Sequence, residues 1–503
     1  MAPERRIIAN TTAQYTRTLI NVCLSLYSTR LILQALGQGD FGIYSVVAGV
    51  VAMLAFMTNA LSNTTQRYLS YYQGKGDQVK MYQVFGNSAL LHVLTGLSIL
   101  FVLSIAAYPV VHQLLSIEPE RQCAATIVYF AALAMLLLSF MTAPFRALFI
   151  AHEDIIYISV VDVIDGALKV LIAIFLTHVA SYDKLIVYSI LMIGISVFNI
   201  LALGVYGLVH YNECHLPHLR EWDREHIRDL SGFVGWTIYG TGCIVARNQG
   251  IAVMLNILCG TIANAAYGIA QQVNGAVAFI SSSIINAMNP QIMQAEGAGN
   301  REEMIQLAEK ESKFSFLLLS LVSVPLLFEM DAVLRLWLSD VPPYASGFCR
   351  MMLLSAVLDQ LSVGLTSANQ AIGQIRTYTL IFYTFKLTAL ATTSVCVLCG
   401  VDPVAALWCL VLTELAGSLL RIILLKHQAD ISIRQFARNV LCRIAFPAIA
   451  ITGACYISIH SITGSLRPLF TLTLGIVCGI IAIWLTALDK SEKQTLTMII
   501  KRR

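Results

Sequence analysis

The stretch GKGDQVKMYQ at residues 74–83 has a second copy, GAGNREEMIQ, at residues 297–306. The offset is 223 positions (297 − 74 = 223), and it carries residues 37–83 onto residues 260–306 without a gap. Internal repeats in a multi-span membrane protein are typical of transporters whose two halves move against each other. The identical pairs are Gly37/Gly260, Tyr44/Tyr267, Val50/Val273, Ala55/Ala278, Phe56/Phe279, Asn63/Asn286, Gly74/Gly297, Gly76/Gly299, Met81/Met304 and Gln83/Gln306.

Composition places the chain in a membrane. Hydrophobic residues make up 57%, charged residues 12%, and the mean hydropathy is +0.72. Apolar runs of spanning length recur along the chain, so we predict an all-α protein with about fourteen spans, grouped as six, six and two. The predicted spans are 11–36, 41–70, 83–112, 123–148, 155–178, 185–209, 230–257, 261–293, 312–338, 347–371, 377–399, 403–427, 441–461 and 466–487.

These spans divide the chain into an N-lobe (1–210), a cytoplasmic linker (211–229), a C-lobe (230–427) and a terminal part (428–503). The terminal part comprises an amphipathic segment at 428–440, the last helix pair and a basic tail. In the amphipathic segment Arg434 and Arg438 oppose four apolar residues, so we expect a short helix on the cytoplasmic membrane surface; the apolar residues are Ile431, Ile433, Phe436 and Val440. Lys and Arg gather at both termini and in alternate loops. The positive-inside rule therefore predicts that both ends are cytoplasmic, which requires an even number of spans. The net charge of +4 is explained by this orientation signal, and we predict no nucleic-acid partner.

Cofactor signals are absent from the sequence. The twelve cysteines are scattered and show no metal-ligand spacing. A loop carries His210, Cys214, His215, His218 and His226, but this spacing matches no standard zinc site, so we predict no metal. No phosphate-binding GxxxxGK[ST] loop occurs, which argues against ATP hydrolysis by this chain. We predict no cofactor beyond a coupling ion, H+ or Na+.

Polar residues inside the predicted spans mark a substrate pathway. In the first span Gln14, Arg17, Asn21, Ser25 and Ser28 are spaced by 3, 4, 4 and 3 residues and share one helical face. We predict that this stripe faces a cavity; the alternative is that Arg17 snorkels to the interface. Arg247 and Gln249 in the seventh span, Gln271 in the eighth and Lys386 in the eleventh are further predicted ligands. The predicted substrate-binding set is Arg17, Asn21, Arg247, Gln249, Gln271 and Lys386.

Acidic residues form a second predicted set, for ion coupling: Asp162, Asp165, Asp359 and Glu414. A membrane carboxylate with no obvious partner is a candidate proton or sodium site, and Glu414 stands alone in its helix. Asp165 has an alternative interpretation, because Lys169 lies four residues further along the helix and could neutralise it.

Several motifs resemble those of bacterial O-antigen and capsular polysaccharide flippases of the multidrug/oligosaccharidyl-lipid/polysaccharide exporter superfamily. They are Leu36-Gly-x-x-Asp-Phe-Gly-Ile-Tyr-Ser, Arg247-Asn-Gln-Gly, Asn264-Ala-Ala-Tyr-Gly-Ile-Ala-Gln-Gln-Val-Asn-Gly-Ala and Asn289-Pro-Gln-Ile. The resemblance implies two six-helix lobes with a cation-lined cavity, and no enzymatic activity. It also implies transfer of a polyprenyl-pyrophosphate-linked oligosaccharide from the inner to the outer leaflet of a bacterial inner membrane, for surface polysaccharide synthesis.

The partners that this resemblance implies are the lipid-linked substrate, membrane lipids and polysaccharide assembly enzymes. Three alternatives stay open. A cation-coupled multidrug exporter of the same superfamily would favour acidic and aromatic cavity walls. A flippase for the peptidoglycan precursor would use much the same chemistry. An integral-membrane glycan polymerase or ligase would need a substantial external loop, and the predicted external loops are short.

Overall fold

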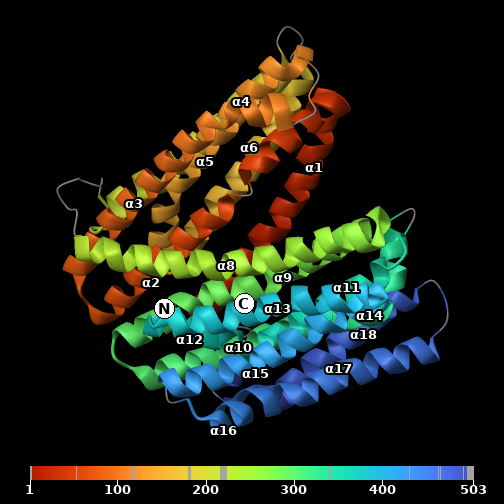
Figure 1. Ribbon diagram of the computed structural model, residues 1–503. Coiled ribbons are helices and arrows are strands. Elements are labelled where there is room, and N and C mark those ends of the chain that lie inside the picture. The colour runs from red at the N-terminus through yellow and green to blue at the C-terminus, as the bar shows by residue number, and fades with distance from the viewer. Residues whose placement is uncertain are drawn as a thin grey trace. The chain divides into compact units, whose positions relative to one another are not determined.

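The computed structural model describes residues 3–494, except 53, 115–116, 118, 179–182, 216–223, 339–340, 430, 463, 465 and 491. The described chain is helical and contains no strand, which confirms the predicted all-α class. Each of the fourteen predicted spans falls on a long helix or on consecutive helical segments (Figure 1). Residues 216–223 of the predicted linker, with His218, lie outside the described residues.

The chain divides into two compact units. The N-unit is Ala9–Ile238, and the C-unit is Tyr239–Arg503 together with Met1–Ile8. The long helices of the first half are α1 (Pro3–Ala52), α2 (Ala55–Lys75), α3 (Gln78–Ile105), α5 (Gln122–Ala151), α6 (Ile155–His178) and α7 (Lys184–His210). Short pieces lie between α3 and α5: α4 (Ala107–Pro109), a π-helix (Val110–Leu114) and a 3₁₀-helix (Pro119–Arg121).

The second half repeats this order. It contains α8 (Arg224–Cys259), α9 (Thr261–Gly297), α10 (Arg301–Trp337), α11 (Ala345–Asp359), the 3₁₀-helix Gln360–Ser362, α12 (Val363–Ile372), α13 (Ile375–Leu398), α14 (Pro403–Ala406) and α15 (Trp408–Ala429). The terminal part contains α16 (Ile433–Phe436), the π-helix Ala437–Leu441, α17 (Cys442–Ser461), α18 (Arg467–Ala482) and the π-helix Ile483–Ala487.

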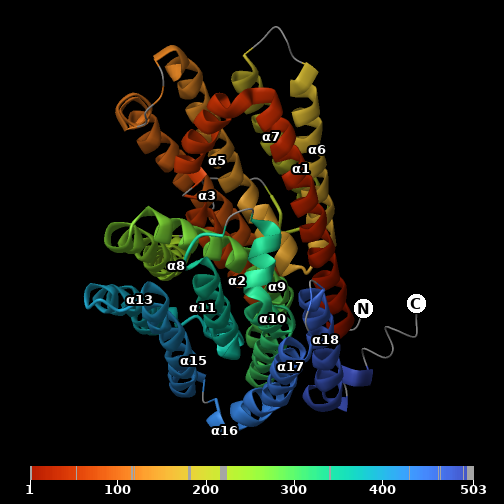
Figure 2. The same cartoon turned by 90° about the vertical axis from the view of Figure 1, so that its right-hand side faces the viewer.

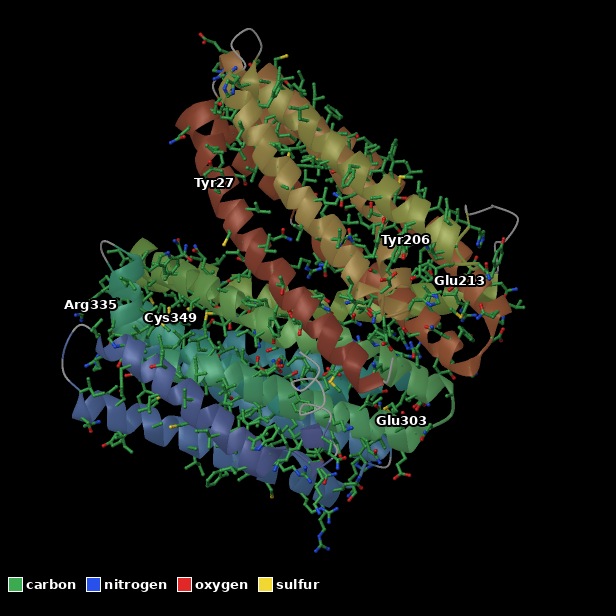
Figure 3. The ribbon with its side chains drawn as sticks, turned by 180° about the vertical axis from the view of Figure 1, so that it is seen from behind. Tyr27, Tyr206, Glu213, Glu303, Arg335 and Cys349 are labelled. Carbon is green, nitrogen blue, oxygen red and sulfur yellow. The ribbon has the colours of Figure 1, made fainter. Side chains whose placement is uncertain are left out.

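Within each unit a few long helices organise the packing. In the N-unit, α5 packs on α2, α3 and α7, while α6 lies beside α1 and α7 (Figure 2). In the C-unit, α10 contacts α9, α11, α12, α17 and α18. Glu303 and Arg335 mark the two ends of α10, and Cys349 shows that α11 starts near the Arg335 end (Figure 3). The C-unit core is therefore built around α10.

Ten helical stretches of the described chain are long and apolar enough to cross a membrane. The remaining long helices, α1, α2, α6 and α9, are not among these stretches. Among them, α1, α6 and α9 carry the predicted site residues Arg17, Asn21, Asp162, Asp165 and Gln271. A helix that exposes such groups to hydrocarbon would be costly, so these three helices require protein or water against their polar faces.

The repeat found in the sequence is also a repeat of backbone conformation. Gly37 (φ 77°, ψ 172°) and Gly260 (φ 87°, ψ 177°) occupy the same region, which side chains essentially exclude. Each of these glycines joins two consecutive helical segments. The second glycine pair, Gly76 (φ 72°) and Gly299 (φ 78°), is left-handed just after α2 and α9.

The residue after each left-handed glycine caps the next helix. Asp77 accepts a hydrogen bond from the Lys80 backbone N–H (3.0 Å), and Asn300 accepts one from that of Glu303 (3.2 Å). A side-chain oxygen at this position satisfies an N–H that has no partner within the helix. The glycine-and-cap pair therefore sets the direction in which α3 and α10 leave the preceding helices.

The amphipathic segment at 428–440 differs from the prediction. We expected the apolar residues Ile431, Ile433, Phe436 and Val440 to lie on the membrane surface. Instead Ile431, Phe436 and Val440 are buried in the C-unit core, whereas Ile433 is exposed. The packing of α10 and α17 against this segment provides an apolar environment that removes the need for lipid.

We predict that Gly37→Ala and Gly260→Ala each destabilise the protein by about 1–3 kcal/mol, because both backbones occupy a region open only to glycine. Thermal unfolding of the purified protein in detergent measures the loss. Gly275→Ala is the control, since Gly275 lies within α9 and an added Cβ would meet nothing within 4 Å. A similar loss in all three variants would contradict the assignment of strain to these two positions.

A second prediction concerns Glu213, which lies just beyond α7 (Figure 3). Burial acts to raise the pKa of Glu213, but the hydrogen bond from His152 Nε2, a backbone hydrogen bond and the electrostatic attraction of His152 together outweigh it, so the pKa lies below its usual value. The pair therefore stabilises the folded state above the unfolded carboxyl pKa of about 4.3, and this contribution is lost as the pH falls through the lower folded pKa.

Glu213→Gln should thus lower the unfolding temperature at pH 7, and the difference from wild type should shrink below about pH 4. The exposed Glu302 is the control: its carboxylate accepts one hydrogen bond, from Gln306 Nε2 at 3.4 Å, so Glu302→Gln should leave the unfolding temperature at pH 7 close to that of the wild type. A difference for Glu213→Gln that is constant with pH would refute the linkage.

Candidate functional site

Five charged side chains meet inside the C-unit and are named here the C-network: Arg247 of α8, Asp359 of α11, Lys386 of α13, and Glu414 and Arg421 of α15. Arg247 Nη1 lies 2.5 Å from Glu414 Oε1, and Lys386 Nζ lies 2.8 Å from Glu414 Oε2. Lys386 Nζ is also 2.8 Å from Asp359 Oδ1, which Arg421 Nη2 approaches to 3.0 Å. The two acids therefore bridge three cations across four helices.

The local sequence explains this arrangement. Glu414 and Arg421 are seven residues apart and share one face of α15. Arg421 is held further by the Asp359 carbonyl (3.0 Å), Ser362 Oγ (3.2 Å) and Tyr378 Oη (3.2 Å). The Phe382 ring lies under Arg421, with 4.5 Å between the guanidinium carbon and the ring centroid.

Burial makes the balance of charge in the C-network important. Glu414, Arg421, Lys386 and Arg247 are all buried. Removing charges from water is expensive unless opposite charges compensate each other closely. Three cations against two acids leave one positive charge (3 − 2 = 1), so the C-network is electrostatically suited to an anion.

The C-network combines residues that the sequence had assigned to two different roles. Arg247 and Lys386 were predicted ligands, whereas Asp359 and Glu414 were predicted ion-coupling acids. The expectation that Glu414 has no partner was wrong, because α8 and α13 bring Arg247 and Lys386 to it. Arg421 was in neither predicted set, although it lies only two helical turns from Glu414 in the same span.

A cavity of about 570 Å³ lies beside α8 and α9 in the C-unit. It contains the predicted ligands Gln249 and Gln271, and Gln249 follows Arg247 by two residues. None of the described residues that line it is charged; their polar groups are amides and one phenol, which suit hydroxyl-rich ligands. The lining residues are Gln249, Ala252, Asn264, Tyr267, Gly268, Gln271 and Gln272.

The N-unit holds a comparable group, named here the N-cluster: Arg17 of α1, Arg146 of α5, and Asp162, Asp165 and Lys169 of α6. Asp162 forms ion pairs with both Arg17 (2.9 Å) and Arg146. Asp165 pairs with Lys169 at 2.6 Å and accepts a hydrogen bond from Asn199 at 2.7 Å. The predicted helical pair of Asp165 and Lys169 is therefore formed.

The polar stripe of α1 packs against α6. A Cβ added to Gly166 would lie 2.8 Å from Asn21 Oδ1, so the two helices touch there, one turn beyond the pair of Arg17 and Asp162. The side chain of Arg17 is 24% exposed and paired with an acid. Arg17 therefore does not simply snorkel to the interface, because it forms an ion pair with Asp162. It also differs from an unpaired arginine that lines a cavity.

The two charge groups share a design. Each contains three cations and two acids, and each draws on the first, fourth and fifth long helices of its half: α1, α5 and α6, or α8, α11 and α13. The similarity extends the sequence repeat from the backbone to the placement of charge, although the charged residues themselves do not align at the offset of 223.

The described residues contain no candidate metal site. Across the described residues, no group of three or more His, Cys, Asp or Glu side chains could hold a metal ion. In the loop that carries several histidines, Cys214 is buried and His215 stacks on Tyr82 with 3.7 Å between ring centroids.

Comparison with known proteins gives the class. Residues 243–397 match the MatE family model. The chain is 20% identical over 337 residues to a protein from Bacillus subtilis named "Uncharacterized membrane protein EpsK", and the match spans 65% of each chain. Part of the chain is therefore similar to the MatE family, and about two thirds of it is similar to the Bacillus subtilis protein.

Solved MATE structures superpose on most of the chain. A MATE protein in the straight conformation gives a TM-score of 0.74 at 14% identity. A superfamily transporter from Pyrococcus furiosus, described as having a binding pocket of reverse polarity, gives 0.75 at 13% identity. A multidrug resistance MATE family transporter in an outward-facing conformation gives 0.70 at 14% identity. Each alignment covers 85% of this chain and 96% of the other.

The protein therefore has the fold of MATE transporters and carries a MatE region in its C-unit. The ten apolar helical stretches of the described chain agree with this membrane fold.

We predict that Glu414→Ala destabilises the protein by about 3–5 kcal/mol, because it leaves Arg247 and Lys386 buried with excess positive charge. The double variant Arg247→Ala/Glu414→Ala should lose less than the sum of the two single variants. Thermal unfolding in detergent measures both.

Lys169→Ala is the matched control for this prediction. It also breaks an ion pair, but the Lys169 side chain is 40% exposed, so the expected loss is below about 1 kcal/mol. Equal losses for Glu414→Ala and Lys169→Ala would show that the C-network is no more than a solvated set of charges.

Proposed function

We propose that the protein is a flippase that moves a polyprenyl-pyrophosphate-linked oligosaccharide from the inner to the outer leaflet of a bacterial inner membrane. The observation that carries this proposal is the pairing of a net positive C-network with an uncharged, amide-lined cavity on α8 and α9. Pyrophosphate needs cations, preferably arginine, whereas sugars need neutral hydrogen-bonding groups. The site offers both within two residues of α8, Arg247 and Gln249.

The energetics of the transfer agree with this proposal. The head group cannot cross hydrocarbon unaided, and a polar pathway within the protein would shield it. Two negative charges that move outward through an interior-negative potential gain about 4.6 kcal/mol per 100 mV, at about 2.3 kcal/mol per charge. The membrane potential therefore favours export of this substrate.

In this proposal the acids have a supporting role. Asp162, Asp165, Asp359 and Glu414 each lie against at least one cation. We assign them to holding the cations in place rather than to binding H+ or Na+. The substrate ligands are then Arg247, Lys386, Gln249 and Gln271 in the C-unit, with Arg17 and Asn21 as their counterparts in the N-unit.

A cation-coupled multidrug exporter is the second candidate. The comparisons favour it, since one structurally similar protein is described as a multidrug resistance transporter. The chemistry of the cavity favours the flippase, because organic cations would call for acidic walls, and no acid lines the cavity. The charge distribution predicts that both termini are cytoplasmic, and this orientation fits either candidate.

Deletion of the gene in the native host separates the two candidates. We expect loss of surface polysaccharide and accumulation of polyprenyl-linked oligosaccharide on the cytoplasmic leaflet, and the trapped lipid would identify the glycan. Extraction and mass spectrometry of the polyprenyl lipids measure this. Normal surface glycan with raised sensitivity to cationic dyes would instead establish the drug exporter.

Complementation of the deletion then tests the cavity. Gln249→Ala/Gln271→Ala should lower surface glycan about tenfold, since losing one or two hydrogen bonds costs about 1–2 kcal/mol. Asn286→Ala, on the exposed part of α9 away from the cavity, is the control and should restore wild-type levels. Full restoration by the double variant would remove the cavity from the site.

A further inference from the structure

A fully buried carboxyl group lies outside both charge groups, at Glu311 of α10. Its exposed fraction is 0%. Glu311 Oε1 accepts a hydrogen bond from Ser367 Oγ of α12 at 2.9 Å. Glu311 Oε2 is buried and has no hydrogen-bond partner among the described residues. The predicted span began at residue 312, so sequence reasoning had placed this residue outside the membrane helix.

The seam between α10 and α12 at this point has no room for a metal ion. A Cβ added to Gly364 would lie 2.0 Å from the Ala308 carbonyl oxygen, so the two backbones touch. Ser312 Oγ donates to that carbonyl (3.1 Å) and accepts from the Gly364 N–H (3.0 Å). A bound metal ion needs several oxygen ligands around it, whereas a proton needs only the carboxyl oxygen.

We propose that Glu311 is a proton-binding site of the C-unit, with the proton held on Glu311 Oε2 in the seam between α10 and α12. An ionised carboxylate here would leave a charged oxygen buried without a partner, which is among the most costly states of a side chain. A proton on Oε2 removes the charge, and Oε1 keeps the hydrogen bond from Ser367 in either state.

The charged groups around Glu311 are engaged elsewhere. Arg421 of α15 is the cation that acts on Glu311 electrostatically, but its guanidinium is bound to Asp359. On α10 itself, Glu309 accepts a hydrogen bond from Asn439 (2.8 Å), and Lys313 pairs with Glu492 at 2.8 Å.

Other charged side chains on the helices that pack against α10 also have partners of their own. The positive charges of Arg438 and Arg443 attract the carboxylate of Glu309 electrostatically. The remaining ion pairs are Glu296–Arg301, Arg350–Asp331, Arg467–Glu329 and Arg443–Asp489. Within the described residues no cation forms an ion pair with Glu311, so a proton is the charge that can neutralise it.

The third long helix of the N-unit, α3, also buries a titratable side chain, His92, close to the position that aligns with Glu311. Because α3 starts at Gln78 and α10 at Arg301, the offset of 223 aligns Ser88 with Glu311 and His92 with Ser315. His92 is 0% exposed; its Nδ1 lies 2.7 Å from the Ser88 carbonyl oxygen, and its Nε2 has no partner among the described residues. The third long helix of each half therefore buries a titratable side chain in this region, with His92 one helical turn beyond the position that aligns with Glu311.

This inference stands apart from the proposed function, because it concerns proton occupancy and not the transported molecule. It assigns the bound proton to a carboxyl group that no cation neutralises, rather than to the four acids that cations already hold. A proton in the seam exchanges with water only when α10 and α12 separate, so its occupancy reports the packing of these two helices.

Infrared spectroscopy of the full-length protein in lipid at pH 7 tests the proposal, because the carbonyl stretch of a neutral carboxylic acid is separate from the bands of carboxylates. We expect such a band in the wild type and its loss in Glu311→Gln. Glu302→Gln, at an exposed position in the first turn of the same helix, is the control and should keep the band.

A second variant protects the test against a folding defect. Ser367→Ala keeps the carboxyl group but removes its hydrogen-bond donor, so the band should persist and shift to higher frequency. A band that survives in Glu311→Gln, or that does not move in Ser367→Ala, would overturn the proposal.

Discussion

Both charge groups of this protein depend on one constraint: a charge buried between helices is stable only against an opposite charge. In the C-unit, Glu414 lies between Arg247 and Lys386, and Asp359 lies between Lys386 and Arg421. In the N-unit, Asp162 does the same for Arg17 and Arg146. These bridges draw four helices together in one unit and three in the other, and each group retains one uncompensated positive charge.

The uncompensated positive charge of the C-network is the structural basis of the proposed function. The cavity is lined by amides and a tyrosine, and its lining residue Gln249 lies two residues from Arg247 on α8; the proposed phosphate and sugar contacts are based on this arrangement. The fold itself is shared with proteins described as multidrug transporters, so the fold does not decide the substrate. The side chains do, because cationic drugs and anionic lipid head groups require walls of opposite polarity.

The sequence predicted the helices better than it predicted their contacts. Apolar length places the fourteen predicted spans on helices, although only ten helical stretches of the described chain meet the length and apolarity needed to cross a membrane, and the repeat follows from glycines such as Gly37 and Gly260. The amphipathic segment at 428–440 was placed on the membrane surface, because periodicity alone cannot distinguish lipid from a neighbouring helix as the cover of Phe436. For the same reason Glu414 was expected to stand alone, and Glu311 was placed outside its helix.

The sequence by itself determined that the chain is a repeated set of membrane helices, since apolar length, the offset of 223 and the glycine positions are local properties. Only the tertiary structure decided which charges neutralise one another. Arg247 and its partner Glu414 are 167 residues apart, and Lys386 and Asp359 are 27 residues apart. No local pattern contains such pairings, because they arise only when separate helices pack and the cost of burying each charge selects its partner.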